Sequence, residues 1–149
     1  MKTALFLVAI LAVGSGLPAA SAAAGPRIQV GVKTILASNG KQFFDPALSA
    51  PLIKELASVF RYASYRLVSG SRMTLQIGQT GRARLAGGRT LQVTPLGIQG
   101  NRARLRLEIY KKNRQIFQTQ IQLRNRSSLI VGGPRHKNGV LLFKVSNQF

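Results

Sequence analysis

From Ser64 to the end of the chain, apolar residues alternate with polar ones in short runs, and turn-forming residues separate the runs. Successive side chains of a β-strand point to opposite faces of the sheet, so this pattern is typical of antiparallel strands with one buried face. Glycine, asparagine and proline predict turns at Ser69–Ser71, Gly78–Gly81, Gly87–Gly88, Gly97–Gly100, Lys111–Asn113, Gly132–Pro134 and Asn138–Gly139. The strands between them are predicted near residues 64–68, 72–77, 82–86, 90–96, 102–110, 115–124, 128–131 and 140–146.

The clearest strand covers residues 102–110, where apolar and charged side chains alternate. Its apolar face holds Ala103, Leu105, Leu107 and Ile109, and its opposite face holds Arg102, Arg104, Arg106 and Glu108. The following run, 115–124, alternates in the same way, with Phe117, Thr119, Ile121 and Leu123 on its apolar face. A turn around Lys111–Asn113 joins the two runs, which are therefore predicted to form an antiparallel hairpin.

The N-terminal half contains the only helical pattern. A first strand is predicted within residues 27–36, and after it Asp45 and Pro46 are suited to the N-cap and first position of a helix over about 46–62. Apolar residues at helical spacing predict a face that packs on a sheet: Leu48, Leu52, Ile53, Leu56, Val59 and Phe60. The expected fold class is mainly β (α+β), an antiparallel sheet or sandwich with one amphipathic helix, in a single domain over residues 27–149.

The first two dozen residues have the pattern of a cleaved signal peptide. Lys2 supplies the positive end, residues 4–13 are an unbroken apolar run, and Ala20–Ala22 is a small-residue cleavage site, so residues 1–22 are assigned to the signal, with cleavage after 22 to 24. An uncleaved anchor would need about 20 consecutive apolar residues, which glycine and proline interrupt here. We therefore expect a periplasmic or extracellular protein with no transmembrane span in the mature form.

The composition is strongly basic. The chain holds 22 Lys and Arg against three Asp and Glu, a net charge of +19, and 45% of its residues are hydrophobic. The hydrophobic fraction favours a folded domain over a disordered polycation. A protein of such charge is attracted to polyanions.

The same composition argues against an enzyme or a metal protein. One His, three carboxylates and no Cys leave little material for acid–base catalysis or for a metal site, so no catalytic residue, metal or cofactor is expected. Each carboxylate has another predicted role: Asp45 caps the helix, Glu55 is solvated on the helix surface, and Glu108 pairs with an arginine across the strands.

The candidate site is an anion-binding surface. Arg102, Arg104 and Arg106 are predicted to project from one sheet face about 6.5–7 Å apart, and guanidinium groups bind phosphate, sulfate and carboxylate. The full set of candidate residues is Arg102, Arg104, Arg106, Lys111, Lys112, Arg114, Arg124, Arg126, Arg135 and Lys137. The segment around His136 has two interpretations, an exposed turn or a glycine-rich anion-binding loop that uses Arg135 and Lys137.

Two functional hypotheses follow. The first is a non-enzymatic exported domain that binds an anionic polymer or envelope component through arginine-rich strand faces, with lipopolysaccharide, acidic polysaccharide and DNA as candidate ligands. The alternative is a structural or accessory subunit of a cell-envelope or secretion assembly that pairs with an envelope protein. Under that alternative the basic charge reflects an acidic environment, where carboxylates are protonated and no longer contribute negative charge.

Four segments resemble small uncharacterised exported proteins of Gram-negative bacteria: Thr34–Ser38, Phe60–Arg66, Val93–Gly97 and Gly132–His136. This resemblance covers most of the mature chain and implies no activity. Residues Thr119–Gly133, which end in Leu129–Gly133, are similar to a strand of outer-membrane secretins that ends in Gly-Gly. That shorter resemblance implies association with an envelope assembly.

Overall fold

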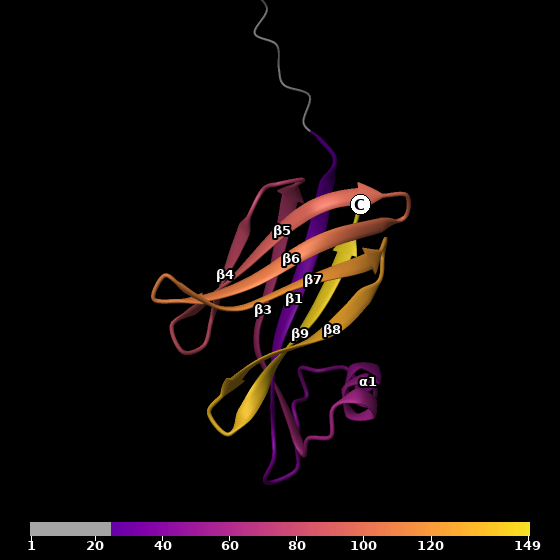
Figure 1. Cartoon of the computed structure of the whole chain (residues 1–149). Coiled ribbons are helices and arrows are strands. Elements are labelled where there is room, and N and C mark those ends of the chain that lie inside the picture. The colour runs from indigo at the N-terminus through magenta and orange to yellow at the C-terminus, as the bar shows by residue number, and fades with distance from the viewer. Residues whose placement is uncertain (1–24) are drawn as a thin grey trace, which may run out of the picture.

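The computed structural model describes residues 25–149, so the predicted signal peptide 1–22 lies outside the described residues. Two β-sheets and one short helix make up this part of the chain (Figure 1). The elements are β1 (Arg27–Ser38), β2 (Phe43–Phe44), α1 (Ala50–Val59), β3 (Ser64–Gln76), β4 (Gly81–Leu85), β5 (Arg89–Gln99), β6 (Arg102–Lys111), β7 (Arg114–Arg124), β8 (Ser128–His136) and β9 (Gly139–Gln148).

The two sheets pack face to face as a sandwich. One sheet has five strands in the order β2-β3-β1-β9-β8, and the other has four in the order β4-β5-β6-β7. All neighbouring strands are antiparallel except the two-residue β2, which runs parallel to β3. Apolar side chains from both sheets form the main core between them, including Ile28, Val30, Leu107 and Phe143. The predicted fold class is confirmed.

The predicted hairpin is present as β6 and β7. Ala103, Leu105, Leu107 and Ile109 are fully buried between the sheets, so the charged residues between them lie on the outer face of the four-stranded sheet. The strands are joined by a two-residue turn in which Lys112 and Asn113 have φ of 50° and 60°. A two-residue turn with two positive φ angles matches the right-handed twist of the strands it joins.

The helix begins later and ends earlier than the range 46–62 predicted from the Asp45–Pro46 signal. It runs over Ala50–Val59, and the Ser49 Oγ accepts a hydrogen bond of 3.3 Å from the Leu52 N–H. Both Asp45–Pro46 and Ser49–Pro51 carry cap and proline signals, and the tertiary structure uses the second pair for the helix. Asp45 instead accepts hydrogen bonds from the N–H groups of Ala47 (2.9 Å) and Leu67 (3.0 Å), which ties the turn before the helix to β3.

The helix covers part of the outer face of the five-stranded sheet, at the lower end of the view in Figure 1. The predicted apolar stripe is present in Leu48, Leu52 and Leu56, which pack against Ile35 and neighbouring residues of that face in a second core. Val59 was expected to belong to the stripe, but it is 66% exposed because the helix ends there.

Two predicted turns are strand instead. Residues 64–76 form the single strand β3, in which Gly70 pairs with Lys33 of β1, because the five-stranded sheet supplies a partner along this whole length. The Gly132–Pro134 segment belongs to β8, with an irregularity in its pairing to β9. A Cβ atom on Gly133 would lie 2.9 Å from the Leu141 carbonyl oxygen and would collide with the Phe143 ring, so this glycine allows close packing within the strand.

Candidate anion-binding surfaces

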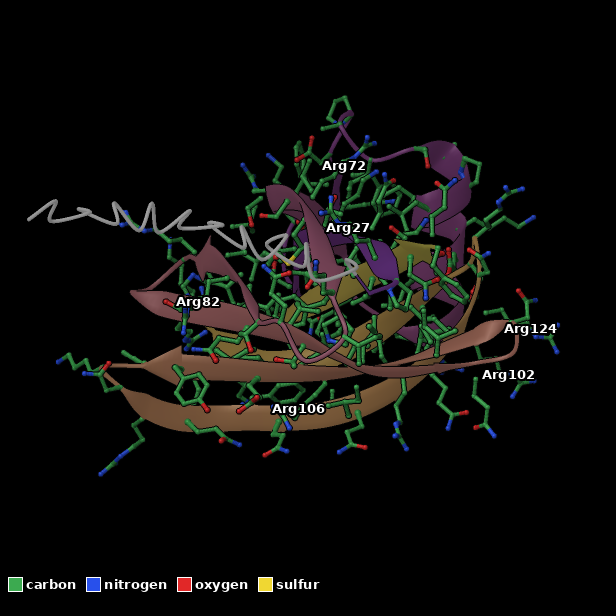
Figure 2. The ribbon with its side chains drawn as sticks, turned by 90° about the horizontal axis from the view of Figure 1, so that it is seen from above. Arg27, Arg72, Arg82, Arg102, Arg106 and Arg124 are labelled. Carbon is green, nitrogen blue, oxygen red and sulfur yellow. The ribbon has the colours of Figure 1, made fainter. Side chains whose placement is uncertain are left out.

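The outer face of the four-stranded sheet carries part of the predicted arginine row. Arg102 and Arg104 are exposed on β6, and Arg124 of β7 lies directly opposite Arg102 in the strand register. Figure 2 shows Arg102 and Arg124 together at one end of this sheet. We call Arg102, Arg104 and Arg124 the arginine corner. It retains two of the three predicted row residues and adds a third cation from the neighbouring strand.

Arg106 differs from its predicted role, because it is bound to Glu108. The Arg106 Nε lies 2.8 Å from Glu108 Oε1, and the Tyr110 hydroxyl donates a hydrogen bond of 2.6 Å to Glu108 Oε2. Glu108 is 9% exposed and sits two residues from Arg106 on the same strand, whereas pairing across strands was predicted. The hydrogen bond to Glu108 raises the pKa of Tyr110. Arg106 therefore lies on the predicted face, but unlike Arg102 and Arg104 it is already paired with a carboxylate.

Three other candidate residues lie at the opposite end of the same hairpin: Lys111, Lys112 and Arg114. β6 has ten residues, and an extended strand rises about 3.3 Å per residue, so roughly 30 Å separates Arg102 from Lys111. These three residues, which we call the hairpin-end cluster, are all exposed. The structure therefore separates them from the arginine corner.

Arg135, Lys137 and His136 lie at the β8–β9 turn. The glycine-rich loop, one of the two interpretations of this segment, is not formed, because Gly132 and Gly133 belong to β8 and the turn contains only Lys137, with φ of 51°, and Asn138. His136 is half-buried, which differs from an exposed turn residue. Arg135 is exposed, and its carbonyl oxygen accepts a hydrogen bond of 2.9 Å from Arg89 Nη2.

Arg89 turns to the inner face of its sheet at this end of the sandwich. It pairs in register with Leu85 and Lys111, and it reaches β8 through the hydrogen bond to Arg135. Arg82 and Arg84 differ from Arg89, because they alternate with the core residues of β4 and are exposed. Burial first, and then the charges of Arg89, Lys137 and Lys111, lower the pKa of His136.

A hollow of about 1050 Å³ on the outer face of the five-stranded sheet was not predicted from the sequence. Its basic residues are Lys33 on β1, Arg72 on β3, Lys144 on β9 and Arg126 on the β7–β8 turn. Arg126 is one of the candidate residues from the sequence, and it belongs to this surface rather than to the arginine corner. We call it the basic hollow; no carboxylate is among its lining residues. The alternation around Ile28, Val30 and Val32 indicated that Lys33 points outward, but residues far apart in sequence supply the neighbouring cations.

Charge is unbalanced over all these surfaces. Lys2 lies outside the described residues, so residues 25–149 hold 21 Lys and Arg and three carboxylates. Within that range the Arg106–Glu108 contact is the only salt bridge. The strand registers place four pairs of like charges directly opposite each other: Arg102 with Arg124, Lys33 with Lys144, Lys111 with Arg114, and Arg89 with Lys111. Like charges in this position repel, and an anion bound between them would remove the repulsion.

Groups suited to catalysis or metal binding do not gather in the described part of the chain. No three His, Cys, Asp or Glu side chains come together in residues 25–149. Asp45 holds two backbone N–H groups, that of Ala47 first, and these hydrogen bonds keep its pKa below the ordinary value. Over the same residues, no helix is long and apolar enough to span a membrane.

The chain was compared with protein-family models, with curated proteins and with solved structures, and none of them matches it.

Proposed function

We propose that the protein is a non-enzymatic exported domain that binds an anionic polymer at the cell envelope, in the periplasm or outside the cell. The observation that carries this proposal is the excess of unpaired cations, placed opposite each other across neighbouring strands. Such an arrangement costs stability in the free protein. A bound polyanion would remove this repulsion, and the counterions released on binding would make the entropy of binding more favourable.

The arginine corner is the surface best suited to a polymer backbone. Arg102 and Arg104 are two residues apart on one strand, which sets their spacing at about 6.5–7 Å, and Arg124 lies beside Arg102. Planar guanidinium groups bind phosphate, sulfate or carboxylate through paired hydrogen bonds. No aromatic side chain belongs to the corner, so it lacks a platform for stacking bases. The proposed recognition is therefore of anionic groups rather than of base sequence.

The test is the salt dependence of binding to duplex DNA. For the triple variant Arg102→Gln, Arg104→Gln and Arg124→Gln, we expect weaker binding and, on duplex DNA, a salt slope smaller by up to about three, because each phosphate contact contributes about 0.9 to the slope. The matched control replaces Lys41, Lys54 and Arg61 by Gln. These exposed residues lie between β1 and β2, on α1 and just after α1. The same charge is therefore removed from outside the arginine corner and the basic hollow. Equal losses in the two triple variants would show that only total charge matters.

Export is a separate part of the proposal and rests on the pattern of residues 1–24. Intact-mass measurement of protein recovered outside the cytoplasm is expected to show a start between Ala23 and Gly25. Full-length protein retained in the inner membrane would contradict export.

A second candidate function is that of an accessory subunit of an envelope assembly. β7 is an 11-residue edge strand, and among residues 25–149 no strand pairs with its outer side. Ile116 on this strand is 40% exposed, and an open edge of this kind is able to accept a strand from another protein. Salt separates the two functions, because strand pairing through backbone hydrogen bonds depends on ionic strength much less than polyanion binding does.

A further inference from the structure

The basic hollow offers a second binding surface, separate from the arginine corner. It lies on the outer face of the five-stranded sheet, and the four-stranded sheet, which carries the corner, packs against the opposite face. α1 covers the part of the outer face that holds Ile35, Tyr65 and Leu142. Beyond the helix, no element within residues 25–149 covers the face, and the hollow is found there. Figure 2 shows Arg72 on this sheet, away from Arg102 and Arg124.

Small residues make the hollow. One register row across four strands reads Arg72, Gly31, Ser146 and Ser128, and the next places Gly70 beside Lys33 and Lys144. A Cβ on Gly31 would approach the Ser146 Oγ to 2.6 Å, so the floor between β1 and β9 is already filled. A Cβ on Gly70 would meet nothing within 4 Å and would enter open space.

The cations stand on both sides of this floor. Lys33 and Lys144 lie directly opposite each other, Arg72 is on β3, and Arg126 projects from the turn that leads into β8. β3 and β8 are three strand spacings apart in the sheet, which corresponds to roughly 14 Å. One phosphate or sulfate ion cannot contact both sides. The site therefore requires an extended ligand with more than one negative group.

The neutral lining indicates the chemistry of such a ligand. Hydroxyl and amide side chains surround the cations: Gln29, Thr74, Ser127, Ser128, Ser146 and Gln148. Hydroxyls and amides both donate and accept hydrogen bonds, so they match sugar hydroxyls, whereas a polyphosphate offers acceptors only. No aromatic side chain lines the hollow, so nucleobases have no stacking partner.

We propose that the basic hollow binds an acidic oligosaccharide segment, a sugar chain bearing carboxylate, sulfate or phosphate groups. Lys33, Lys144 and Arg72 hold the anionic groups, and the serine, threonine and glutamine side chains hold the hydroxyls. The volume of about 1050 Å³ is slightly above the range of about 300–1000 Å³ for small-molecule sites, and it accommodates a few sugar residues. This site is distinct from the arginine corner, so the two proposals stand or fall separately.

The test uses a charge-neutral block of the hollow. In Gly70→Phe the new ring enters the open space, while every cation remains in place. The probes are a heparin hexasaccharide and a galacturonate hexasaccharide, with a polyphosphate of matched charge for comparison. We expect affinity for both hexasaccharides to fall at least tenfold and affinity for polyphosphate to change less than threefold.

Two further variants keep the result decisive. If Gly70→Phe lowers the thermal midpoint, the pair Lys33→Gln and Lys144→Gln replaces it, because both residues lie on the outer face and their substitution leaves the core intact. The arginine-corner triple variant is expected to retain hexasaccharide binding within about threefold while it loses duplex DNA. Unchanged hexasaccharide binding in both hollow variants would overturn the inference, as would an equal loss of polyphosphate in Gly70→Phe. Neither of these results affects the arginine corner.

Discussion

Replacing Arg124 by Glu is expected to stabilise the protein and weaken its binding at the same time. Arg124 lies opposite Arg102 on neighbouring strands, where Cβ atoms are about 4.5–5.5 Å apart. The change turns a repulsive pair into an attractive one. Opposite charges in this position contribute about 0.2–1 kcal/mol, and solvent exposure of both residues holds the total gain to about 0.5–1 kcal/mol.

The gain is measurable by thermal unfolding. For a domain of about 125 residues, 1 kcal/mol corresponds to roughly 4 °C, so the midpoint is expected to rise by about 2–4 °C at low salt. Binding to duplex DNA is expected to weaken, with the salt slope reduced by up to about two. One phosphate contact is lost at position 124, and Arg102 is now paired with the new carboxylate.

The control is Arg61→Glu, which changes the net charge equally at an exposed residue after α1. Its effect on stability is expected to be smaller, because charges separated by more than about 8–10 Å are largely screened at moderate salt. If Arg124→Glu stabilises no more than Arg61→Glu, or if it leaves the salt slope unchanged, the opposed arginines are not the basis of binding.

Two other predictions concern stability. Ser49→Ala removes the side chain that caps α1 through the Leu52 N–H, so the free energy of unfolding is expected to fall by about 1 kcal/mol in denaturant titrations. An unchanged free energy of unfolding would contradict the capping role of Ser49 and would favour Asp45 as the N-cap. The folded pKa of His136 lies below its ordinary value of 6.5, so on acidification the unfolded chain takes up a proton while the folded protein does not. The contribution of His136 to the free energy of unfolding is therefore fully present above about pH 7, and it is lost as the pH falls through 6.5 toward the folded pKa. His136→Gln is expected to abolish this pH dependence in unfolding experiments over pH 5–7.

Local pattern was sufficient for the strands whose partner is adjacent in sequence. In β6 and β7 the alternation of apolar and polar residues sets the buried face, and the two-residue turn at Lys112–Asn113 sets the register. It was not sufficient where tertiary pairing overrides a turn signal. Gly70 sits in a strand because β1 pairs along its whole length, and Gly133 does so because β8 packs closely on the Phe143 ring.

In the candidate sites too, local pattern predicts some features and tertiary structure determines the others. Arg102 and Arg104 were placed correctly on an outer face because strand alternation alone decides it. The ion pair between Arg106 and Glu108 depends on side-chain geometry along one strand face, where Tyr110 also binds the carboxylate. Strand alternation does not predict this pairing. The basic hollow combines β1, β3 and β9 with the β7–β8 turn, so no local window contains its residues. Only the order of strands in the sheet brings them together.

The most direct test of polyanion binding is to follow the arginine Nε–H resonances by NMR while a short DNA duplex is added. Arg102, Arg104 and Arg124 have no carboxylate partner, so their signals are expected to shift most among the arginines of the four-stranded sheet. Arg106 lies on the same face but is already bound to Glu108, so its signal is expected to move least. Arg61, after the helix, reports the effect of total charge. Equal shifts at Arg61, Arg106 and the arginine corner would contradict the proposed site.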